Sequence, residues 1–210
     1  MGFGNWWDEV VVPRVVKLGG STEAIMAIRR DVVPMAKGRV LELGCGGGIN
    51  QLLLDPARVD SYSGVDPSEK GLDYARQSAA QMGWQADIRP GVGEQIPFAD
   101  ESFDTVVCTL TLCTVADQAR TLSEIRRVLK PGGTYLFAEH GRSPDPKVAR
   151  RQERIDPLWG RIFGGCHTSR SVGPAIERAG FAVDHIGARY MEKSPKFVGW
   201  MEWGKAVRTG

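Results

Sequence analysis

The stretch VLELGCGGGIN, residues 40–50, indicates how this chain folds. The residues before Gly44 predict a short strand that carries one acid, Glu42, and the glycines predict a tight turn. A helix is expected to start at Ile49. A strand, a glycine turn and a helix in this order place backbone N–H groups at the carboxyl edge of a sheet, where open α/β sheets bind ligands. The stretch therefore predicts both an α/β fold and the position of its binding site.

Two classes of cofactor use such a turn. A dinucleotide fold requires G-x-G-x-x-G after the first strand, and here Ile49 stands at the sixth position. An acid inside the strand also suits a ligand with a cationic group better than a pyrophosphate. The pattern E-x-G-x-G-x-G, from Glu42 to Gly48, resembles motif I of the class I S-adenosylmethionine (SAM) methyltransferases. A glycine-rich loop without a ligand is the simpler alternative.

Composition limits the class of protein. The chain has 210 residues, of which 42% are hydrophobic and 25% charged, which suits one globular α/β domain. A net charge of +2 argues against a strongly basic nucleic-acid surface, so we expect no nucleic-acid partner, although charge alone does not exclude a small RNA substrate. Residues 1–9 lack a basic region followed by an apolar run, so we expect no signal peptide, no transmembrane segment and a cytoplasmic protein. None of the four cysteines forms C-x-x-C, and we expect no metal site.

Two helices are expected before the first strand. The first has apolar residues at roughly helical spacing, and the second starts at the N-cap candidate Ser21 and ends at Pro34. Residues 1–36 could form a lid over the cofactor or pack on the sheet, and the sequence leaves both open. Paired tryptophans are more often core residues, although Trp6 and Trp7 could also contact a sulfonium through cation–π interactions.

Asp66 ends the second predicted strand, at residues 61–66. It follows Gly48 at close to the ~20-residue offset at which an acid accepts hydrogen bonds from a ribose. Its carboxylate can accept both hydroxyls of an adenosine ribose. Ser68 is better placed to cap the next helix, whose buried stripe is predicted at Leu72, Ala75, Ala79 and Met82.

The rest of the chain continues the alternation of strands and helices, which predicts a parallel sheet with right-handed crossovers. Asp117 is expected to cap one helix, and Thr168 or Ser169 another. A turn is expected at residues 130–133, a polar linker leads into a further helix, and the chain breaks again at residues 164–167. The remaining strands are predicted at residues 86–89, 102–110, 134–139, 181–190 and 198–207, the last two as a hairpin.

Four motifs in order look like a class I SAM-dependent methyltransferase. They are Glu42–Gly48, Gly64–Ser68, Ile96–Phe98 with Ser102–Asp104, and Arg127–Gly133. The resemblance implies a three-layer Rossmann-like fold with helices on both faces. Its seven-stranded, mostly parallel sheet would have the order 3-2-1-4-5-7-6, with the last strand antiparallel. It also implies a single domain over residues 1–210, divided into a helical lid (1–36), a cofactor-binding half (37–140) and a substrate-side half (141–210).

A second set of motifs resembles a subgroup of methyltransferase-like proteins that includes membrane-associated alkyl thiol S-methyltransferases. These motifs are Val107–Val115, Glu139-His140, Gly164–His167 and Gly204–Val207. The chain departs from that subgroup at its start. Members of the subgroup carry a hydrophobic anchor there, whereas this chain carries Trp6 and Trp7. This departure leaves membrane attachment and substrate class open, because the subgroup match identifies a scaffold better than a substrate.

The resemblance implies SAM as the cofactor and S-adenosylhomocysteine as the product. Many such enzymes read the adenine with an acid and a small residue after the third strand. Here Val92 stands at the position of the acid, so backbone groups at Gly93 and Glu94 are expected to do the reading. The full set of cofactor-binding candidates is Glu42, Gly44, Cys45, Gly46, Gly48, Asp66, Pro67, Gly93, Glu94 and Thr109.

Methyl transfer from SAM is an in-line displacement, so positioning the acceptor is the main task of the enzyme. A thiol acceptor, with a pKa near ~8.5, needs modest help to ionise. His140 follows the fifth strand on the cofactor edge and is the candidate base or orienting partner, although a structural histidine is equally consistent with the sequence. Candidates for the substrate pocket are Trp6, Trp7, Cys113, His140, Cys166 and His167. Burial as small hydrophobic residues is the alternative for the two cysteines.

Several functions stay open on sequence alone. The main expectation is methyl transfer to a small-molecule acceptor, such as a thiol. The alternatives are a C- or O-methyltransferase of a quinone-like or natural-product acceptor, and a catalytically silent SAM-binding protein. Ile49 argues against a dinucleotide-dependent oxidoreductase. The sequence does not determine the oligomeric state.

Overall fold

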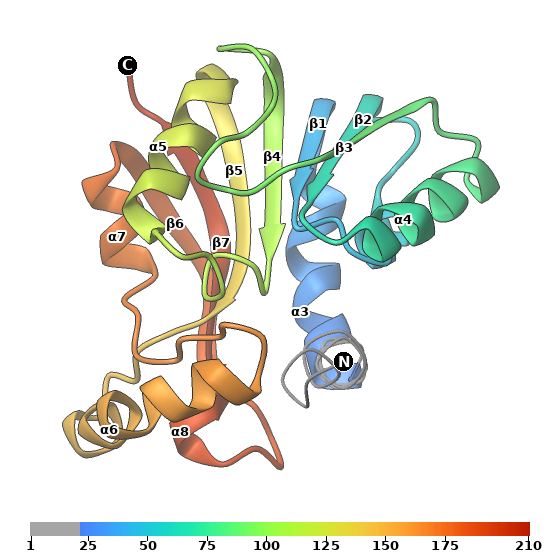
Figure 1. Cartoon of the computed structure of the whole chain (residues 1–210). Coiled ribbons are helices and arrows are strands. Elements are labelled where there is room, and N and C mark those ends of the chain that lie inside the picture. The colour runs from blue at the N-terminus through green and yellow to red at the C-terminus, as the bar shows by residue number, and fades with distance from the viewer. Residues whose placement is uncertain (1–21) are drawn as a thin grey trace.

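One seven-stranded sheet organises the chain (Figure 1). The computed structural model describes residues 22–210. The sheet has the order β3-β2-β1-β4-β5-β7-β6, as predicted. Strands β1 to β5 run parallel, and β7 is antiparallel to both β5 and β6. The strands are β1 Gly38–Leu43, β2 Val59–Asp66, β3 Ala86–Pro90, β4 Phe103–Thr109, β5 Leu129–His140, β6 Phe181–Tyr190 and β7 Trp200–Arg208.

Helices cover both faces of the sheet, so the fold has three layers. Strand side chains alternate between the faces, and β1 shows the result. Val40 packs into a core with apolar residues of α3 (Glu23–Val32) and α4 (Glu69–Gln81). Leu41 packs into a second core with residues of α5 (Gln118–Val128) and α7 (Gly173–Arg178). The expected three-layer α/β architecture is confirmed.

Helix α3 packs on the sheet. Ile25, Ile28 and Val32 are buried in the same core as Trp203 of β7, whose indole Nε1 donates to Asp31 Oδ2 at 3.1 Å. The helix gives way at Val33 to a 3-10 turn, η2 (Val33–Met35), which contains Pro34. Ser21, Trp6 and Trp7 lie outside the described residues. The lid function of residues 1–36 therefore stays a prediction.

Several local predictions were wrong. The predicted helix does start at Ile49, but it is a short 3-10 helix, η3 (Ile49–Leu53). Pro56 disfavours helical backbone at the residue before it and so limits any extension. Neither Thr168 nor Ser169 caps α7, which starts after Val172 without a side-chain cap. The Thr168 hydroxyl instead donates to the backbone of Phe197. Residues 196–199 form a short helix, α8 (Lys196–Gly199), so β7 begins at Trp200.

The turn at residues 130–133 interrupts a strand and does not precede one. Strand β5 begins at Leu129, which pairs with Phe103 of β4, and the regular register resumes at Thr134 opposite Thr105. Gly132 takes a φ of 73° inside this irregularity. The predicted helix caps Ser68 and Asp117 are confirmed, since each side chain accepts a backbone N–H of the following turn.

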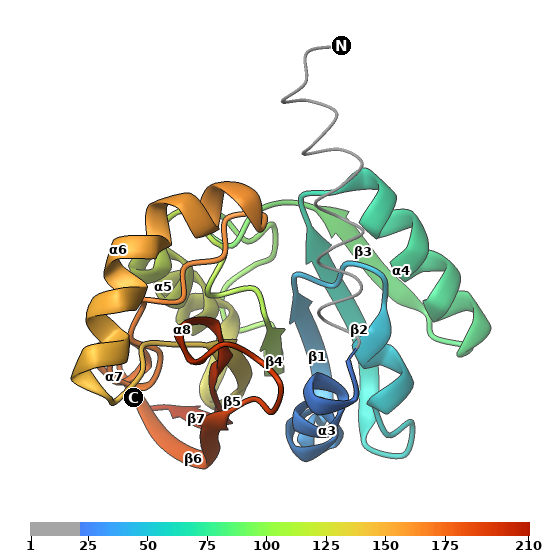
Figure 2. The same ribbon diagram turned by 90° about the horizontal axis from the view of Figure 1, so that it is seen from below.

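The carboxyl ends of β1 to β5 meet at one edge of the sheet, which Figure 2 shows from below. Helix α6 (Pro146–Ile162) and α8 lie at this edge, beside the loops that follow β4 and β5 (Figures 1 and 2). Within residues 22–210, none of the helices has the length and apolar character needed to span a membrane. The edge where ligands bind in this type of sheet therefore carries both the glycine turn and the loops predicted to form the acceptor pocket.

Candidate functional site

The glycine turn is held tightly between β1 and β2. The backbone N–H groups of Gly44 and Cys45 both donate to the carbonyl oxygen of Val65, at 2.8 and 3.1 Å. Gly44 has a φ of 74°, and a Cβ there would collide with the side chain of Thr111. Gly48 has a φ of 73° and would meet Ser78. Glycine is therefore required at both positions, by backbone angle and by space.

Asp66 joins the end of β2 to the glycine turn. Its Oδ2 accepts from the Gly46 N–H at 2.9 Å, and its Oδ1 accepts from the Ser68 N–H at 2.9 Å. Burial raises the pKa of Asp66, against the opposing effect of these two hydrogen bonds. Pro67 begins the connection from Asp66 to α4. A carboxylate at this point can accept further hydrogen bonds, since each oxygen has more than one acceptor site.

Glu42 lies at the centre of a buried polar network. Its Oε2 accepts from the hydroxyl of Tyr62 at 2.6 Å and its Oε1 from Asn50 Nδ2 at 2.8 Å. Asn50 Oδ1 in turn accepts from the Arg29 guanidinium at 2.6 Å, and Arg29 and Asn50 both donate to the Thr109 hydroxyl. Burial raises the pKa of Glu42 to about 7, although Tyr62, Arg29 and Asn50 act in the opposite direction.

Arg29, Asn50 and Tyr62 are site residues that the sequence analysis missed. A signal for Arg29 was available: Ile25, Ile28, Arg29 and Val32 follow the spacing i, i+3, i+4, i+7 of a buried helix stripe, and all four are buried. A cation at a buried stripe position requires an anionic partner. Glu42 and Glu139 both favour the charged form of Arg29, whose pKa burial lowers.

The two residues predicted to contact the adenine, Gly93 and Glu94, pack against the start of α5. The Glu94 carboxylate accepts from the Asp117 N–H at 2.9 Å, so this side chain holds the start of α5. A Cβ at Gly93 would meet Thr121 of α5. A pocket opens nearby at the end of β3, lined by Pro90, Gly91, Val92, Gln95, Ile96, Pro97 and Phe98.

Glu139, near the end of β5, shapes the loop that follows β4. Its carboxylate accepts the backbone N–H groups of Thr111, Leu112 and Cys113, at 3.1, 3.0 and 3.1 Å. Burial raises the pKa of Glu139, and the three N–H donors oppose that rise. The side chain is fully buried. The Glu139 carboxylate therefore holds the backbone of the loop after β4 at three consecutive residues.

Three residues predicted for the pocket come together at this edge. Cys166 Sγ lies 3.8 Å from Cys113 Sγ and 3.7 Å from His140 Nδ1. A hydrogen bond with Cys113, and then the His140 ring, lower the pKa of the Cys166 thiol. The same thiol–thiol contact and burial raise the pKa of Cys113. No metal-ligating cluster is expected from the sequence, because local spacing does not reveal that these three residues meet.

His167 does not join this group through its side chain. Its Nδ1 lies 2.6 Å from Asp156 Oδ2 on α6, whereas its backbone N–H donates to the carbonyl of Cys113 at 2.8 Å. The backbone bond ties the loop after α6 to the loop after β4. His185, on β6, contacts Glu202 at 3.4 Å.

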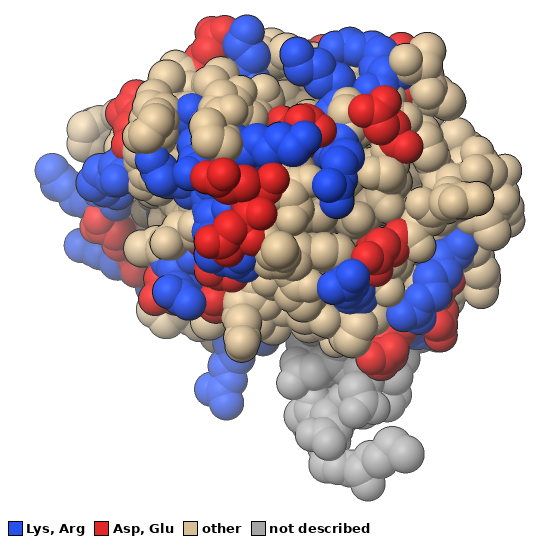
Figure 3. Space-filling view, turned by 90° about the horizontal axis from the view of Figure 1, so that it is seen from above, with Lys and Arg blue, Asp and Glu red and all other residues tan. Residues whose placement is uncertain are grey.

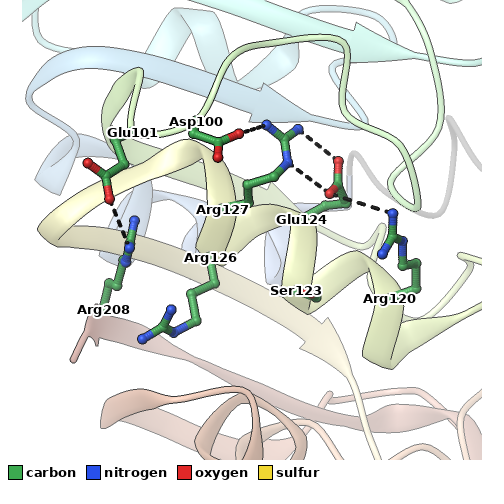
Figure 4. A pocket seen from close by; sticks show the side chains of 8 residues that line it. All are labelled: Asp100, Glu101, Arg120, Ser123, Glu124, Arg126, Arg127 and Arg208. Carbon is green, nitrogen blue, oxygen red and sulfur yellow. Dashed lines mark hydrogen bonds and ion pairs between the residues drawn. The ribbon is translucent and has the colours of Figure 1, made fainter. Parts of the chain in front are cut away.

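A second pocket lies at the opposite, amino-terminal edge of the sheet. Figure 3 shows that face, where basic and acidic side chains are intermixed. In Figure 4, Arg127 points toward Asp100 and Glu124, and Arg208 toward Glu101. Their ion-pair distances are 2.6, 2.8 and 3.0 Å. Because these arginines are already paired, we interpret this pocket as a surface ion network.

Comparison with known proteins agrees with this geometry. A family described as a methyltransferase domain matches residues 41–137. The chain is 33% identical over 182 residues to thiol S-methyltransferase TMT1B of Homo sapiens, covering 82% of this chain and 72% of the relative. It is 34% identical over 152 residues to a ubiquinone biosynthesis O-methyltransferase of Dinoroseobacter shibae, covering 67% and 60%.

Among solved structures, the fold is similar to that of the YcgJ protein of Bacillus subtilis. The TM-score is 0.69 at 18% identity, over 89% of this chain and 98% of that one. This similarity supports the fold. The chain spans 59–72% of the length of the thiol S-methyltransferase relatives that it matches.

Proposed function

Because this chain belongs to the class I SAM-dependent methyltransferases, in the subgroup that includes thiol S-methyltransferases, we propose that it transfers the methyl group of SAM to a small thiol. The observation that carries this proposal is the meeting of Cys113, His140 and Cys166 at the cofactor edge of the sheet. SAM is the methyl donor that the family and fold imply. The acceptor is the part of the proposal that needs a direct test.

The cofactor would lie across the carboxyl ends of β1 and β2. Asp66 would accept the ribose hydroxyls, and the turn from Gly44 through Cys45 and Gly46 to Gly48 would line the methionine part. The Glu42 network with Thr109 lies beneath that turn, and the Glu42 carboxylate, when ionised, would favour the cationic end of the ligand. The pocket near Gly93 and Glu94 would receive the adenine ring.

The acceptor would lie over the ends of β4 and β5. A thiol is a weak nucleophile until it ionises, so a group that removes or holds its proton raises the rate. His140 is the next residue in the chain after Glu139, and its Nδ1 lies 3.7 Å from Cys166 Sγ. Cys113, Cys166 and the backbone at His167 would form the wall of the pocket.

In this arrangement the two halves of the domain would have different roles. Residues 37–140 would bind the cofactor, and residues 141–210 would supply the substrate side through α6 and the loop at Cys166. All four cysteines are free thiols in the structure, which suits a reducing compartment such as the cytoplasm.

One specific observation favours a second candidate, an O-methyltransferase of a quinol or phenol. It is the similarity to the ubiquinone biosynthesis O-methyltransferase of D. shibae. We prefer the thiol because a phenol ionises near pKa ~10, against ~8.5 for a thiol, and so needs more help to lose its proton.

Calorimetry followed by an acceptor panel tests the proposal. S-adenosylhomocysteine should bind saturably and NAD should not. With SAM present, release of S-adenosylhomocysteine should depend on an added alkyl thiol and not on an added catechol or quinol. Binding of NAD without binding of S-adenosylhomocysteine would remove the cofactor assignment, and a response to quinols alone would select the second candidate.

A further inference from the structure

Three soft or borderline donor atoms converge from three separate segments of the fold. Cys113 comes from the loop after β4, His140 from the end of β5, and Cys166 from the loop after α6. Their Sγ and imidazole nitrogen atoms all lie within 4.8 Å of one another. We infer that these residues bind a thiophilic metal ion of the Zn²⁺ type through a Cys₂His ligand set.

The separations fit the geometry of such an ion. Zinc bonds of about 2.3 Å to sulfur and about 2.0–2.1 Å to nitrogen, at tetrahedral angles, place two sulfur ligands about 3.8 Å apart and a sulfur and a nitrogen about 3.6 Å apart. The distance between Cys166 Sγ and Cys113 Sγ is 3.8 Å, and that between Cys166 Sγ and His140 Nδ1 is 3.7 Å. Two of the three edges of the ligand triangle therefore already have the required length.

The surrounding backbone holds these ligands in place. Glu139 accepts the N–H of Cys113, and His167 donates its N–H to the Cys113 carbonyl. The Cys166 N–H donates to the carbonyl of Phe163. Gly165 has a φ of 82°, and a Cβ there would lie 2.9 Å from the Thr114 carbonyl oxygen, so the two loops approach as closely as glycine allows. Outer contacts of this kind orient the ligands in known metal sites.

The ligand set also indicates which ion is bound. Two thiol sulfurs and an imidazole suit zinc and other thiophilic ions, whereas Mg²⁺ and Ca²⁺ prefer oxygen. In the part of the chain that the structure describes, no further His, Cys, Asp or Glu joins the group. Three protein ligands and an open fourth position are typical of zinc sites that act on a bound molecule.

The open position gives the metal a role in methyl transfer, and this role rests on the proposed function. The acceptor thiol would replace water on the metal and lose its proton to solvent, because a coordinated thiol is deprotonated. Its sulfur would then form a bond to the SAM methyl carbon as the sulfonium C–S bond breaks. S-adenosylhomocysteine leaves as a neutral thioether, and the methylated product leaves the metal. His140 would act here as a ligand, with the metal taking over the task of keeping the acceptor ionised.

Cobalt titration of the full-length protein tests the site independently of activity. The protein is stripped with a chelator, kept reduced with a phosphine that does not supply thiols, and titrated with Co²⁺. One equivalent should produce intense visible bands of tetrahedral cobalt and a sulfur-to-cobalt charge-transfer band. One equivalent of Zn²⁺ should then abolish both, because zinc binds more tightly than cobalt.

Substitution of each ligand distinguishes a specific metal site from adventitious binding of the ion elsewhere on the protein. Cys113→Ser, Cys166→Ser and His140→Ala should each remove the tetrahedral bands and weaken Zn²⁺ binding by more than the roughly 10–100-fold that loss of an outer partner costs. Cys45→Ala removes a buried thiol outside the group and should leave the bands unchanged. A cooperative unfolding transition in denaturant shows that each variant is folded.

Octahedral cobalt spectra in the wild-type protein, or bands of equal intensity in the three ligand variants, would overturn the metal site. Addition of a small alkyl thiol should shift the charge-transfer band as a third sulfur binds. A normal cobalt spectrum that no thiol perturbs would overturn the role in acceptor activation. Normal spectra with a thiol-induced shift but no methyl transfer would instead count against the proposed function.

Discussion

The carboxylate of Asp66 accepts a hydrogen bond from the backbone N–H of Gly46, at 2.9 Å. The same side chain accepts the Ser68 N–H that precedes α4. The acid at the end of β2 therefore fixes the glycine turn after β1 and the start of the next helix at once. A change at Asp66 should therefore affect both the glycine turn and the proposed contact to the ribose.

Asp66→Ala should weaken binding of S-adenosylhomocysteine by about 10–150-fold. The substitution removes a charge-assisted acceptor worth about 1.5–3 kcal/mol and frees the turn at Gly46. Calorimetry measures the change. Asp73→Ala, which removes an exposed acid of α4 that pairs with Arg76, is the control and should bind normally. Equal affinity of folded Asp66→Ala and wild type would move the ribose contact elsewhere.

Glu42 should make the stability of the unliganded protein depend on pH near neutrality. Burial raises the pKa of Glu42 from 4.5 to about 7, so the folded state binds this proton more tightly than the unfolded state. The free energy of unfolding should then fall as the pH rises from about 4.5 to about 7, by an amount on the order of 3 kcal/mol for this group.

Glu42→Gln isolates that contribution. Denaturant unfolding at several pH values should show the variant losing less stability than the wild type across this window, since Gln cannot titrate. Identical slopes of unfolding free energy against pH in the two proteins would show that Glu42 titrates at its ordinary value in the fold.

Arg29 should be essential to the network beneath the glycine turn. Its side chain is buried and donates to Asn50 and Thr109. Arg29→Met leaves Glu42 without its buried cation, which typically costs about 3–5 kcal/mol. The loss should be larger at pH 8 than at pH 6, because protonated Glu42 needs no counter-charge.

The neighbouring Arg30 provides the control for Arg29. It is exposed and pairs with Glu23 at 2.6 Å, and such surface pairs contribute about 0–1 kcal/mol. Arg30→Met should therefore unfold close to the wild type in the same denaturant series. Similar, small losses in both variants would mean that Arg29 is dispensable to the network.

The order of the sheet could be predicted because four motifs occur in register along the chain. The strands and two helix caps, Ser68 and Asp117, follow from local patterns. Short elements were harder. Pro56 ends η3 after a single 3-10 segment, and α7 starts without a side-chain cap, so no capping residue marks it.

The site was less predictable than the fold, because its contacts join residues far apart in the sequence. Asp66 was identified from its offset to the glycine turn. Arg29 reaches Thr109 from a helix that precedes the first strand. The meeting of Cys113 with Cys166 depends on how the loops after β4 and α6 pack, and no local spacing encodes that packing.

His140→Ala should lower turnover with an alkyl thiol by ~10²-fold at pH 7, because the variant lacks the group that, as base or as metal ligand, keeps the acceptor ionised. The loss should shrink as the pH rises toward the thiol pKa of ~8.5, since the acceptor then ionises unaided. Affinity for S-adenosylhomocysteine should stay unchanged. His185→Ala, on β6 beside Glu202, is the matched control. Full activity of His140→Ala at pH 7 would assign His140 a structural role.

The most direct test of the account is to identify the atom that receives the methyl group. The full-length protein is incubated with SAM carrying a deuterated methyl group and an equimolar mixture of an alkyl thiol, a catechol and a quinol, and the products are separated by mass spectrometry. We expect one labelled product, the methyl thioether, formed in step with S-adenosylhomocysteine. A labelled methyl ether or ring-methylated product, with the thiol unchanged, would contradict it.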